Sequence, residues 1–440
     1  MSWTYYSELL ATPVPRYTSY PTAAEFTESV AREDMAEALA SVTTDQAVSL
    51  YVHVPYCHEI CWYCGCNTGA ANKPQRLAGY LDALHAEIEL VAQRLDGRGK
   101  VHRIAFGGGS PNAIAPEQFA ALLDKLRATF AASEALVSIE LDPRSLSGPW
   151  FEAIAAAGIQ RASLGVQTLE ETVQRAIGRY QPLGLIEIAV SELRRAGVGS
   201  LNFDLMYGLP FQGLAELEDT LAKSLEIQPE RIALFGYAHV PHLIPRQRRI
   251  DGNALPDFEL RFQQAELGQR ILADGGYQPV GFDHFALPHD PLARAARHGS
   301  LRRNFQGFTD DQAEVVIGLG ASAISQFPSL IVQNDKNVGR YRVRVSAGML
   351  PADRGARRTE EDRRRGSVIE WLLCDGVADI GRLLDSTLRS ALEPFVARGL
   401  ARLIGTQLHL SGHARPYARA IASLFDQYRQ PSARRFSSAI

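Results

Sequence analysis

The sequence lacks the features that would place the protein in a membrane, in a secretory route or on nucleic acid. No apolar run among its 440 residues approaches the length that spans a bilayer. The start, MSWTYYSELLATPVPRY, has no charged segment followed by an apolar core, so it predicts no secretory signal. The formal net charge of -3 gives no reason to expect nucleic acid as a partner. We therefore expect a cytoplasmic protein.

Cysteine is scarce outside one short loop. Four of the five cysteines lie in the segment CHEICWYCGC between Cys57 and Cys66, and the fifth is Cys374. This usage fits a reducing compartment. A structural zinc site usually shows two separated pairs of ligands, and the sequence holds no second pair. Cys374 ends the apolar stretch 368–374, which predicts a buried structural thiol.

The first three cysteines of this loop, Cys57, Cys61 and Cys64, have the spacing C-x3-C-x2-C. Three close thiolates, rather than two matched pairs, favour an iron–sulfur cluster with one iron open to a ligand that is not protein. Cys66 could instead complete a four-thiolate set, so a structural metal stays an alternative. The loop follows the β-branched, apolar stretch 49–55, which predicts a strand. In parallel α/β folds the ends of strands are where chemistry is placed.

The rest of the chain alternates between β-rich apolar segments and segments of helical periodicity. We predict strands over 47–54, 101–106, 136–141, 161–166, 201–206 and 231–237. We predict helices over 77–95, 115–130, 183–196 and 214–227. Six strands that alternate with helices predict an α/β fold with a parallel sheet and right-handed crossovers. Six units suit a partial (β/α)6 TIM-like barrel better than a complete eight-unit barrel.

The same patterns predict three parts of the chain. Residues 1–35 lack a clear period and are interpreted as an extended arm. Residues 36–333 form the barrel and its extension. Beyond them the alternation stops, and 334–440 are mostly helical in pattern, with a short hairpin around Gly405. This predicts a small winged-helix-like C-terminal domain, a fold that does not by itself imply DNA binding.

A glycine run and several polar residues follow the predicted strands. The run FGGGSP at 106–111 follows the second strand, and glycine there lets the backbone approach a ligand closely. A tight turn explains the run equally well when it is taken alone. Glu140 ends the third strand, Gln167 ends the fourth and Asp204 lies within the fifth. Polar residues at successive strand ends of one barrel favour a shared binding site.

The cysteine loop just past a strand resembles the radical S-adenosylmethionine (SAM) superfamily, in which C-x3-C-x2-C holds a [4Fe–4S] cluster that chelates SAM. Further motifs extend the resemblance, over nearly the whole chain, to the oxygen-independent coproporphyrinogen III oxidase family. These motifs are PRYTSYPT at 15–22, YVHVPYC at 51–57, CGCN at 64–67, YAHVP at 237–241, DHFA at 283–286, RNFQG at 303–307, GASAIS at 320–325 and RFSSAI at 435–440.

The resemblance implies a role for each matching residue. One [4Fe–4S] cluster per chain would be held by Cys57, Cys61 and Cys64, and two SAM molecules would bind. The first SAM would contact Tyr51, Gly108, Glu140 and Ile324, with Phe305 and Gln306 lining the site near it. The second SAM would contact Tyr63, Gly109, Ser110, Gln167, Arg179, Asp204 and Ala238. The chain departs from the family pattern at Ser110-Pro111-Asn112, where Thr-Pro-Thr is usual, but Ser110 keeps the hydroxyl.

The implied reaction is the oxidative decarboxylation of two propionates of coproporphyrinogen III to vinyl groups, which gives protoporphyrinogen IX in haem biosynthesis. The reduced cluster would cleave SAM to a radical that takes hydrogen from the β-carbon of a propionate. The electron donor would be a protein such as flavodoxin or ferredoxin, and the resemblance favours a monomer. Because the substrate carries four carboxylates, arginines are expected to meet it. The candidates are Arg16, Arg246, Arg248 and Arg249.

Two other functions stay open at this stage. Related haem chaperones share the core and the cluster but bind haem without decarboxylating it. They commonly have an aromatic residue where Cys66 stands and lack the N-terminal arm, so this sequence favours the enzyme. The other alternative is a structural metalloprotein without turnover. Tyr51 and Cys66 are candidate catalytic residues, although Cys66 is equally well explained as a free thiol near the cluster.

Overall fold

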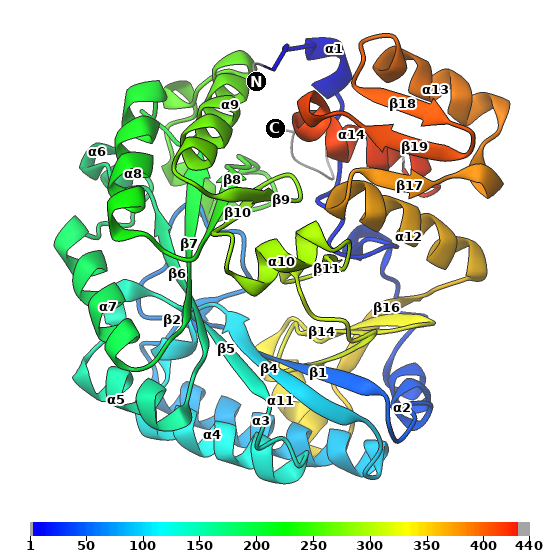
Figure 1. Cartoon of the computed structure of the whole chain (residues 1–440). Helices are drawn as coiled ribbons and strands as arrows, with labels where there is room; N and C mark the ends of the chain where they lie inside the picture. Colours follow the sequence, from blue (N-terminus) through cyan, green and yellow to red (C-terminus); the bar gives the residue numbers. More distant parts are fainter. Residues whose placement is uncertain (1–2, 430–440) are drawn as a thin grey trace.

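A twelve-stranded sheet forms the centre of the computed structural model, which describes residues 3–429 (Figure 1). The strand order is β16-β15-β14-β13-β1-β4-β5-β6-β7-β8-β10-β9. Its six middle strands run parallel, as the sequence predicts. They are β1 (Ala47–Val54), β4 (Lys100–Gly108), β5 (Leu136–Leu141), β6 (Arg161–Gln167), β7 (Ser200–Tyr207) and β8 (Arg231–Gly236). The predicted fold class, a partial six-unit α/β barrel, is confirmed.

Helices that connect these strands cover the outer face of the sheet (Figure 1). They are α3 (Pro74–Leu95), α4 (Pro116–Thr129), α5 (Gly148–Ala157), α6 (Glu171–Ala176), α7 (Leu183–Arg195) and α8 (Leu214–Ile227). Each longer helix is amphipathic. In α7, for example, Ile186, Ala189, Val190 and Leu193 are buried at spacings of three and four residues. The apolar stripe therefore fixes which side of the helix meets the sheet.

The sheet extends beyond the six parallel strands at both edges. On one side β13 (Val315–Leu319) runs parallel to β1, and β14 (Ile324–Phe327), β15 (Leu330–Asn334) and β16 (Ala352–Arg357) follow in antiparallel order. On the other side β10 (His284–Ala286) and β9 (Gln278–Val280) continue the sheet. The three-part division of the chain stays a proposal. On the evidence of strand pairing we place its second boundary after Arg357 rather than at residue 333, because β15 and β16 belong to the main sheet.

The remaining elements before the C-terminal segment include α9, two-stranded pairings and 3-10 helices labelled η. They are α1 (Ser7–Leu10), η1 (Ala23–Glu25), α2 (Arg32–Ala40), β2 (Tyr56–Cys57), β3 (Gly69–Ala70), η2 (Pro111–Ala113), η3 (Pro143–Ser145), η4 (Pro245–Arg249), η5 (Gly252–Ala254), α9 (Phe258–Asp274), α10 (Pro291–Arg297), β11 (Arg302–Asn304), β12 (Gly307–Thr309) and α11 (Val338–Ser346).

The C-terminal segment packs helices against a small three-stranded sheet of order β17-β19-β18. Its elements are α12 (Glu360–Cys374), β17 (Val377–Asp379), η6 (Gly381–Leu383), α13 (Ser386–Val396), β18 (Ala401–Ile404), β19 (Gln407–Leu410), η7 (Gly412–Tyr417), α14 (Ala418–Ala422) and η8 (Ser423–Phe425). The predicted hairpin is confirmed, with Gly405 at φ 61° between its strands. Cys374 is buried, as predicted. The RFSSAI motif at 435–440 lies outside the described residues.

The N-terminal arm runs between the sheet edge and the C-terminal segment (Figure 1). The backbone N–H of Tyr6 donates to Tyr417 Oη at 2.9 Å. The Tyr17 hydroxyl donates to Asp426 Oδ2 at 3.0 Å. The ring of Trp3 packs edge-on against Phe262 of α9, with centroids 6.0 Å apart. Within the described residues, the arm is therefore joined both to the segment around 417–426 and to α9.

A buried carboxyl group in α3 ties the helix to the added strands of the sheet. Glu87 Oε2 accepts hydrogen bonds from Gly320 N and from the Tyr341 hydroxyl, each at 2.6 Å. Glu87 Oε1 accepts from Asn334 Nδ2 at 2.7 Å. The side chain is fully buried, and burial raises the pKa of Glu87 to about 7.

This raised pKa makes stability depend on pH. Because the folded pKa of Glu87 exceeds its unfolded value, its contribution is complete below about pH 4.5 and is lost as pH rises through about 7. Between these values the unfolding free energy of the wild type should fall by about 3 kcal/mol relative to Glu87→Gln. Denaturant titrations of both proteins from pH 5 to pH 8 measure this difference. Parallel pH profiles would show that Glu87 does not titrate in this range.

Candidate active site at the strand ends

A pocket of about 510 Å³ opens at the carboxyl ends of the parallel strands. It brings together most of the predicted site residues. Those lining it are Cys57, Cys61, Tyr63, Cys64, Cys66, Gly108, Gly109, Glu140, Gln167, Arg179, Asp204 and Ala238. We call it the site pocket. Residues from six different strand ends thus face one space, which is the usual arrangement of a barrel active site.

The three predicted cluster ligands in the site pocket all have hydrogen-bonded sulfur atoms. The sulfur atom of each accepts a hydrogen bond: Cys57 Sγ from Thr68 Oγ1 at 3.3 Å, Cys61 Sγ from Arg179 Nη1 at 3.3 Å, and Cys64 Sγ from the backbone N–H of Cys66 at 3.4 Å. Such bonds stabilise sulfur that carries negative charge, as in a thiolate bound to iron. Cys66 itself is exposed.

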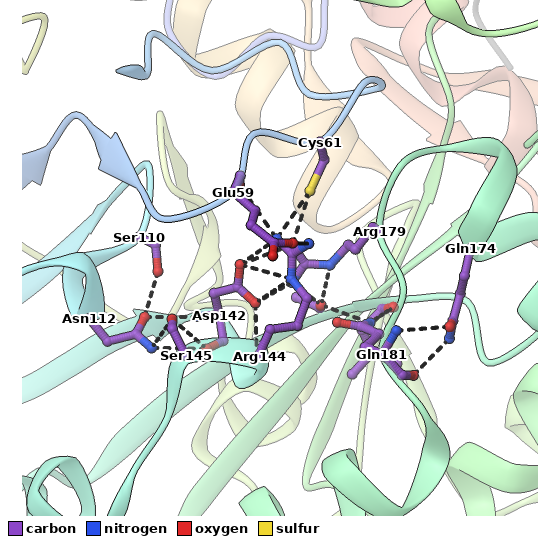
Figure 2. Close-up of polar contacts among 12 residues, drawn as sticks. Glu59, Cys61, Ser110, Asn112, Asp142, Arg144, Ser145, Gln174, Arg179 and Gln181 are labelled. Carbon is purple, nitrogen blue, oxygen red and sulfur yellow. Dashed lines mark hydrogen bonds and ion pairs between the residues drawn. The ribbon is translucent and has the colours of Figure 1, made fainter. Parts of the chain in front are cut away.

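Two arginines donate hydrogen bonds to Cys61, and one aspartate binds both arginines. We call this group of Asp142, Arg144 and Arg179 the Asp142 clamp. Arg144 Nη2 donates to Cys61 Sγ at 3.4 Å, so this sulfur receives hydrogen bonds from Arg144 as well as from Arg179. Asp142 lies between the guanidinium groups and accepts from Arg144 Nη2 at 2.6 Å and from Arg179 Nη2 at 3.2 Å. Figure 2 shows both guanidinium groups reaching toward the Cys61 sulfur. The clamp joins the end of β5 to the cysteine loop.

The two guanidinium groups of the Asp142 clamp set the charge state of Asp142. Burial alone would raise the pKa of Asp142, but Arg179 and Arg144 outweigh burial and lower that pKa below its ordinary value. Asp142 therefore stays a carboxylate. The sequence contains it in the segment ending the third strand, yet gives no sign that Arg179, 37 positions away, would be its partner.

The buried side-chain amide of Gln174 fixes the segment that carries Arg179. Gln174 Nε2 donates to the carbonyl oxygens of Thr168 and Gln181, at 2.9 and 3.0 Å. The backbone N–H of Trp62, inside the cysteine loop, donates to Ile177 O at 3.0 Å. The loop and the Arg179 segment are thus bonded to each other independently of the clamp.

The glycine run at the end of β4 lies against the strand that leads into the cysteine loop. A β-carbon at Gly109 would lie 2.5 Å from the carbonyl oxygen of Tyr56 in β2. Gly108 has φ 114° and leaves room for the ring of His53. Close approach between backbone segments, rather than a simple turn, is what requires glycine here.

Adding one methyl group at Gly109 should therefore disturb binding of SAM, the ligand that the resemblance implies for this residue. In Gly109→Ala the backbone of Tyr56 must move, and Cys57 moves with it, so we expect the Kd for SAM to rise by about tenfold, or about 1.4 kcal/mol. Equilibrium binding of SAM to cluster-loaded protein without oxygen measures the effect. Gly184→Ala is the matched control, because a β-carbon there meets no atom within 4 Å. Equal affinity in both variants would contradict this account.

Two carboxyl groups face the site pocket from neighbouring strands. Although Glu140 is open to the pocket, the protein around it removes solvent, and this burial together with Asp204 raises the pKa of Glu140 to about 7. Gly108 N–H donates to Glu140 Oε2 at 3.2 Å. Burial also raises the pKa of Asp204, whose carboxylate accepts from Ser163 and Asn202, each at 2.8 Å. Near neutral pH Glu140 can therefore both donate and accept hydrogen bonds.

The remaining predicted site residues lie outside the lining of the site pocket. The rings of Tyr51 and Phe305 pack edge to face, with centroids 4.9 Å apart. In the sheet Tyr51 of β1 pairs with Gly318 of β13, and Gly318 lies against the backbone of Ile324. Gln306 lines an adjoining cavity of about 320 Å³ that shares Glu140 and Asp204 with the site pocket.

Ser110 is buried, and its hydroxyl donates to Asn112 Oδ1 at 2.5 Å. Asn112 in turn donates to Asp142 O at 2.9 Å. The departure from the usual family pattern thus forms a polar link between the ends of β4 and β5. Among the candidate arginines, Arg16 lines the site pocket, whereas Arg248 and Arg249 are exposed on η4.

Gln247 of η4 was not predicted, although it holds two predicted residues together. Its Nε2 atom donates to Tyr63 O at 2.9 Å and to Ala238 O at 3.0 Å. The side chain is buried. Nothing in the local sequence indicates this role, because Tyr63 lies 184 positions away in the chain.

Comparison with known proteins decides the family. The profile of the Radical SAM superfamily matches residues 51–223. The oxygen-independent coproporphyrinogen III oxidase of Bradyrhizobium diazoefficiens is 41% identical over 437 residues, which cover 97% of each chain. The enzyme of the same name from Escherichia coli is 35% identical, over 96% of this chain and 94% of its own. The chain belongs to this family.

The structural comparison agrees with membership of the oxygen-independent coproporphyrinogen III oxidase family. The solved structure of coproporphyrinogen III oxidase (HemN) from Escherichia coli, described as a radical SAM enzyme, superposes with a TM-score of 0.90. It is 33% identical and covers 98% of this chain and all of its own. The protein is therefore an enzyme of the radical SAM superfamily. Within residues 3–429, no helix is both long and apolar enough to cross a bilayer.

A [4Fe–4S] cluster and SAM, which membership implies, fit the residues of the site pocket. Three thiols with hydrogen-bonded sulfurs line one side of it, and the glycine run and polar strand ends line the rest. In the described part of the chain, no three His, Cys, Asp or Glu side chains are placed to share a single metal ion.

Proposed function

We propose that the protein converts coproporphyrinogen III to protoporphyrinogen IX by oxidative decarboxylation of two propionate side chains. The observation that carries this proposal is the set of three C-x3-C-x2-C thiols with hydrogen-bonded sulfurs, facing a large pocket in a chain that matches its relatives over its full length. Coproporphyrinogen III is the substrate that family membership implies.

We propose that Cys57, Cys61 and Cys64 hold one [4Fe–4S] cluster. Burial raises the pKa of Cys57 to about 11, so iron must displace its proton. When bound, the cluster and SAM supply the one-electron chemistry that removes a hydrogen atom from an unactivated carbon. Two SAM molecules per chain remain our proposal, with the residues assigned to each as the resemblance implies.

The residues of the site pocket would bind and orient SAM and the substrate, and would exclude water. The Asp142 clamp fixes Cys61 by two hydrogen bonds. Glu140, Gln167 and Asp204 offer polar contacts to the hydroxyl and amino groups of a nucleoside. The edge-to-face rings of Tyr51 and Phe305 lie outside the lining of the site pocket, and the resemblance implies that they meet the first SAM. Reactive carbon chemistry needs an enclosed and ordered site, because water and misplacement both waste the reactive species.

We further propose an electron donor, an oligomeric state and a cellular location for the reaction. The electron would come from a small donor protein such as flavodoxin or ferredoxin, and the chain would act as a monomer in the cytoplasm. Cys66 is the candidate catalytic thiol, since it lies at the edge of the site pocket next to a cluster ligand. These points rest on the resemblance and on the reduced cysteines.

An assay without oxygen tests the proposed function. Reduced, cluster-loaded protein is mixed with SAM and coproporphyrinogen III, and vinyl product and 5′-deoxyadenosine are measured together. We expect both to accumulate in a constant ratio. Cleavage of SAM without decarboxylation would instead point to a different substrate.

A further inference from the structure

The sulfur atoms of the three proposed cluster ligands receive hydrogen bonds from different kinds of donor. Cys57 Sγ accepts from a neutral hydroxyl, and Cys64 Sγ accepts from a neutral backbone N–H. Cys61 Sγ, by contrast, accepts from two guanidinium groups, Arg144 Nη2 at 3.4 Å and Arg179 Nη1 at 3.3 Å. The donors at Cys61 therefore bring positive charge to the sulfur as well as hydrogen bonds.

Arg144 reaches Cys61 without lining the site pocket. Arg179 lines the pocket, where the resemblance assigns it to the second SAM, whereas Arg144 is not among the described residues that do so. The Arg144 guanidinium donates to Asp142, to Glu59 Oε2 at 2.9 Å and to the Cys61 sulfur (Figure 2). Its side chain is only 10% exposed. Arg144 is thus placed to act on the sulfur rather than on a ligand in the pocket.

The Asp142 clamp carries more positive than negative charge. Two buried guanidinium groups share one carboxylate, which leaves one positive charge beside the Cys61 sulfur. Glu59 adds a second carboxylate, but its side chain is exposed, so water screens its charge. Burial alone would lower the pKa of Arg144, but the hydrogen bond to Asp142 outweighs burial and raises that pKa. Arg144 therefore stays cationic.

A buried cation beside a ligand sulfur changes how readily an iron–sulfur cluster accepts an electron. Reduction adds one electron from the donor protein, and so one negative charge, with no bond formed or broken. A nearby cation stabilises this added charge, and most strongly where the surroundings exclude water. Cys61 is 4% exposed and so meets this condition. Net charge and hydrogen bonds to the sulfurs are among the factors that set the reduction potential of such clusters.

We propose that Arg144 raises the reduction potential of the cluster and so sets which donor proteins can reduce it. The inference rests on the proposed function, in which Cys61 is a ligand of a [4Fe–4S] cluster. Arg144 is then a positioning residue that acts through the Cys61 sulfur, and Asp142 opposes it by offsetting part of the positive charge. Without Arg144, the protein would need a more strongly reducing donor.

A redox titration of the cluster tests this proposal without turnover. Cluster-loaded protein without SAM is titrated with dithionite and redox mediators in the absence of oxygen, and the reduced cluster is counted by electron paramagnetic resonance. We expect Arg144→Gln to weaken reduction by about tenfold, which lowers the midpoint potential by about 59 mV for one electron. Arg144→Lys keeps the charge and should lower it less. Arg402→Gln removes an exposed arginine of β18 and, as the matched control, should leave the potential unchanged.

The opposite change of charge at Asp142 separates an electrostatic effect from a general disturbance of the loop. Asp142→Asn keeps the size of the side chain and removes its negative charge, so the midpoint potential should rise. Shifts of Arg144→Gln and Asp142→Asn in the same direction would overturn the proposal. The resonance signal comes only from protein that holds a cluster, so a poorly loaded variant still reports its potential. If Arg144→Gln holds no cluster, Asp142→Asn decides: a rise supports the proposal, and a fall or no shift overturns it.

The outcomes separate this inference from the proposed function. An unchanged potential in Arg144→Gln overturns the role of Arg144, even if the wild type makes protoporphyrinogen IX. Conversely, the expected shift in a protein whose wild type makes no product counts against the proposed function alone. Iron and sulfide per chain are measured for every variant, and a wild type that holds no [4Fe–4S] cluster would overturn both.

Discussion

Replacing Cys61 with alanine is expected to abolish product formation and to prevent the protein from retaining a [4Fe–4S] cluster. Cys61 is the buried member of the three proposed ligands, and its sulfur is the one that receives two arginine hydrogen bonds. Without it, two thiolates remain to hold four irons, which leaves a further corner open to solvent. Iron and sulfide per chain, the absorbance of the reconstituted protein and the anaerobic assay measure the effect.

Two other cysteines serve as matched controls for this experiment. Cys374→Ala removes a buried thiol in α12, outside the cysteine loop, and should leave the iron content unchanged. Cys66→Ser removes the exposed thiol of the loop and should also leave it unchanged. Loss of iron in Cys66→Ser would show that all four loop thiolates bind the metal, and full iron content in Cys61→Ala would show that the cluster lies elsewhere.

Asp142→Ala is expected to have the second-largest effect, although Asp142 is not a proposed ligand. The variant leaves the guanidinium groups of Arg144 and Arg179 together beside Cys61 with their shared carboxylate gone. Removing one partner of a buried ionic group costs about 3–5 kcal/mol, because the other charges stay buried without compensation. We expect lower thermal stability and a fall in product formation of at least about a hundredfold.

Glu59→Gln is the control that separates the Asp142 clamp from ordinary surface charge. Glu59 accepts a hydrogen bond from Arg144 Nη1 at 2.9 Å, but its side chain is 74% exposed. Such exposed pairs contribute about 0–1 kcal/mol. The Glu59 variant should therefore keep nearly full activity and stability. If the two variants behaved alike, Asp142 would be one surface partner of Arg144 and not the centre of a clamp.

The sequence predicted the parallel half of the sheet well, because each strand there is rich in apolar residues and is flanked by helices of clear period. The predicted range 47–54 matches β1, and 136–141 matches β5. The antiparallel strands β14 and β15 were missed. They have four and five residues and are paired through a tight connection, so they are too short to show a period.

The site was predictable to the extent that it is local in sequence. The cysteine spacing and the glycine run carry their own signal, and the structure places both on the site pocket. The partners that fix these residues are distant in the chain. Asp142 reaches Arg179 across 37 positions, and Gln247 reaches Tyr63 across 184. Contacts of this kind are set by strand order, which no single segment encodes.

The joining of the two chain ends bears on how the protein is made. Tyr6 and Tyr17 of the arm bond to residues 411 and 409 positions later, and Arg16 between them faces the site pocket. During translation the arm can meet α9 and the barrel first, whereas its partners Tyr417 and Asp426 are made later. A nascent chain with a finished barrel therefore still lacks these two contacts, so full docking of the arm waits until residue 426 has been made.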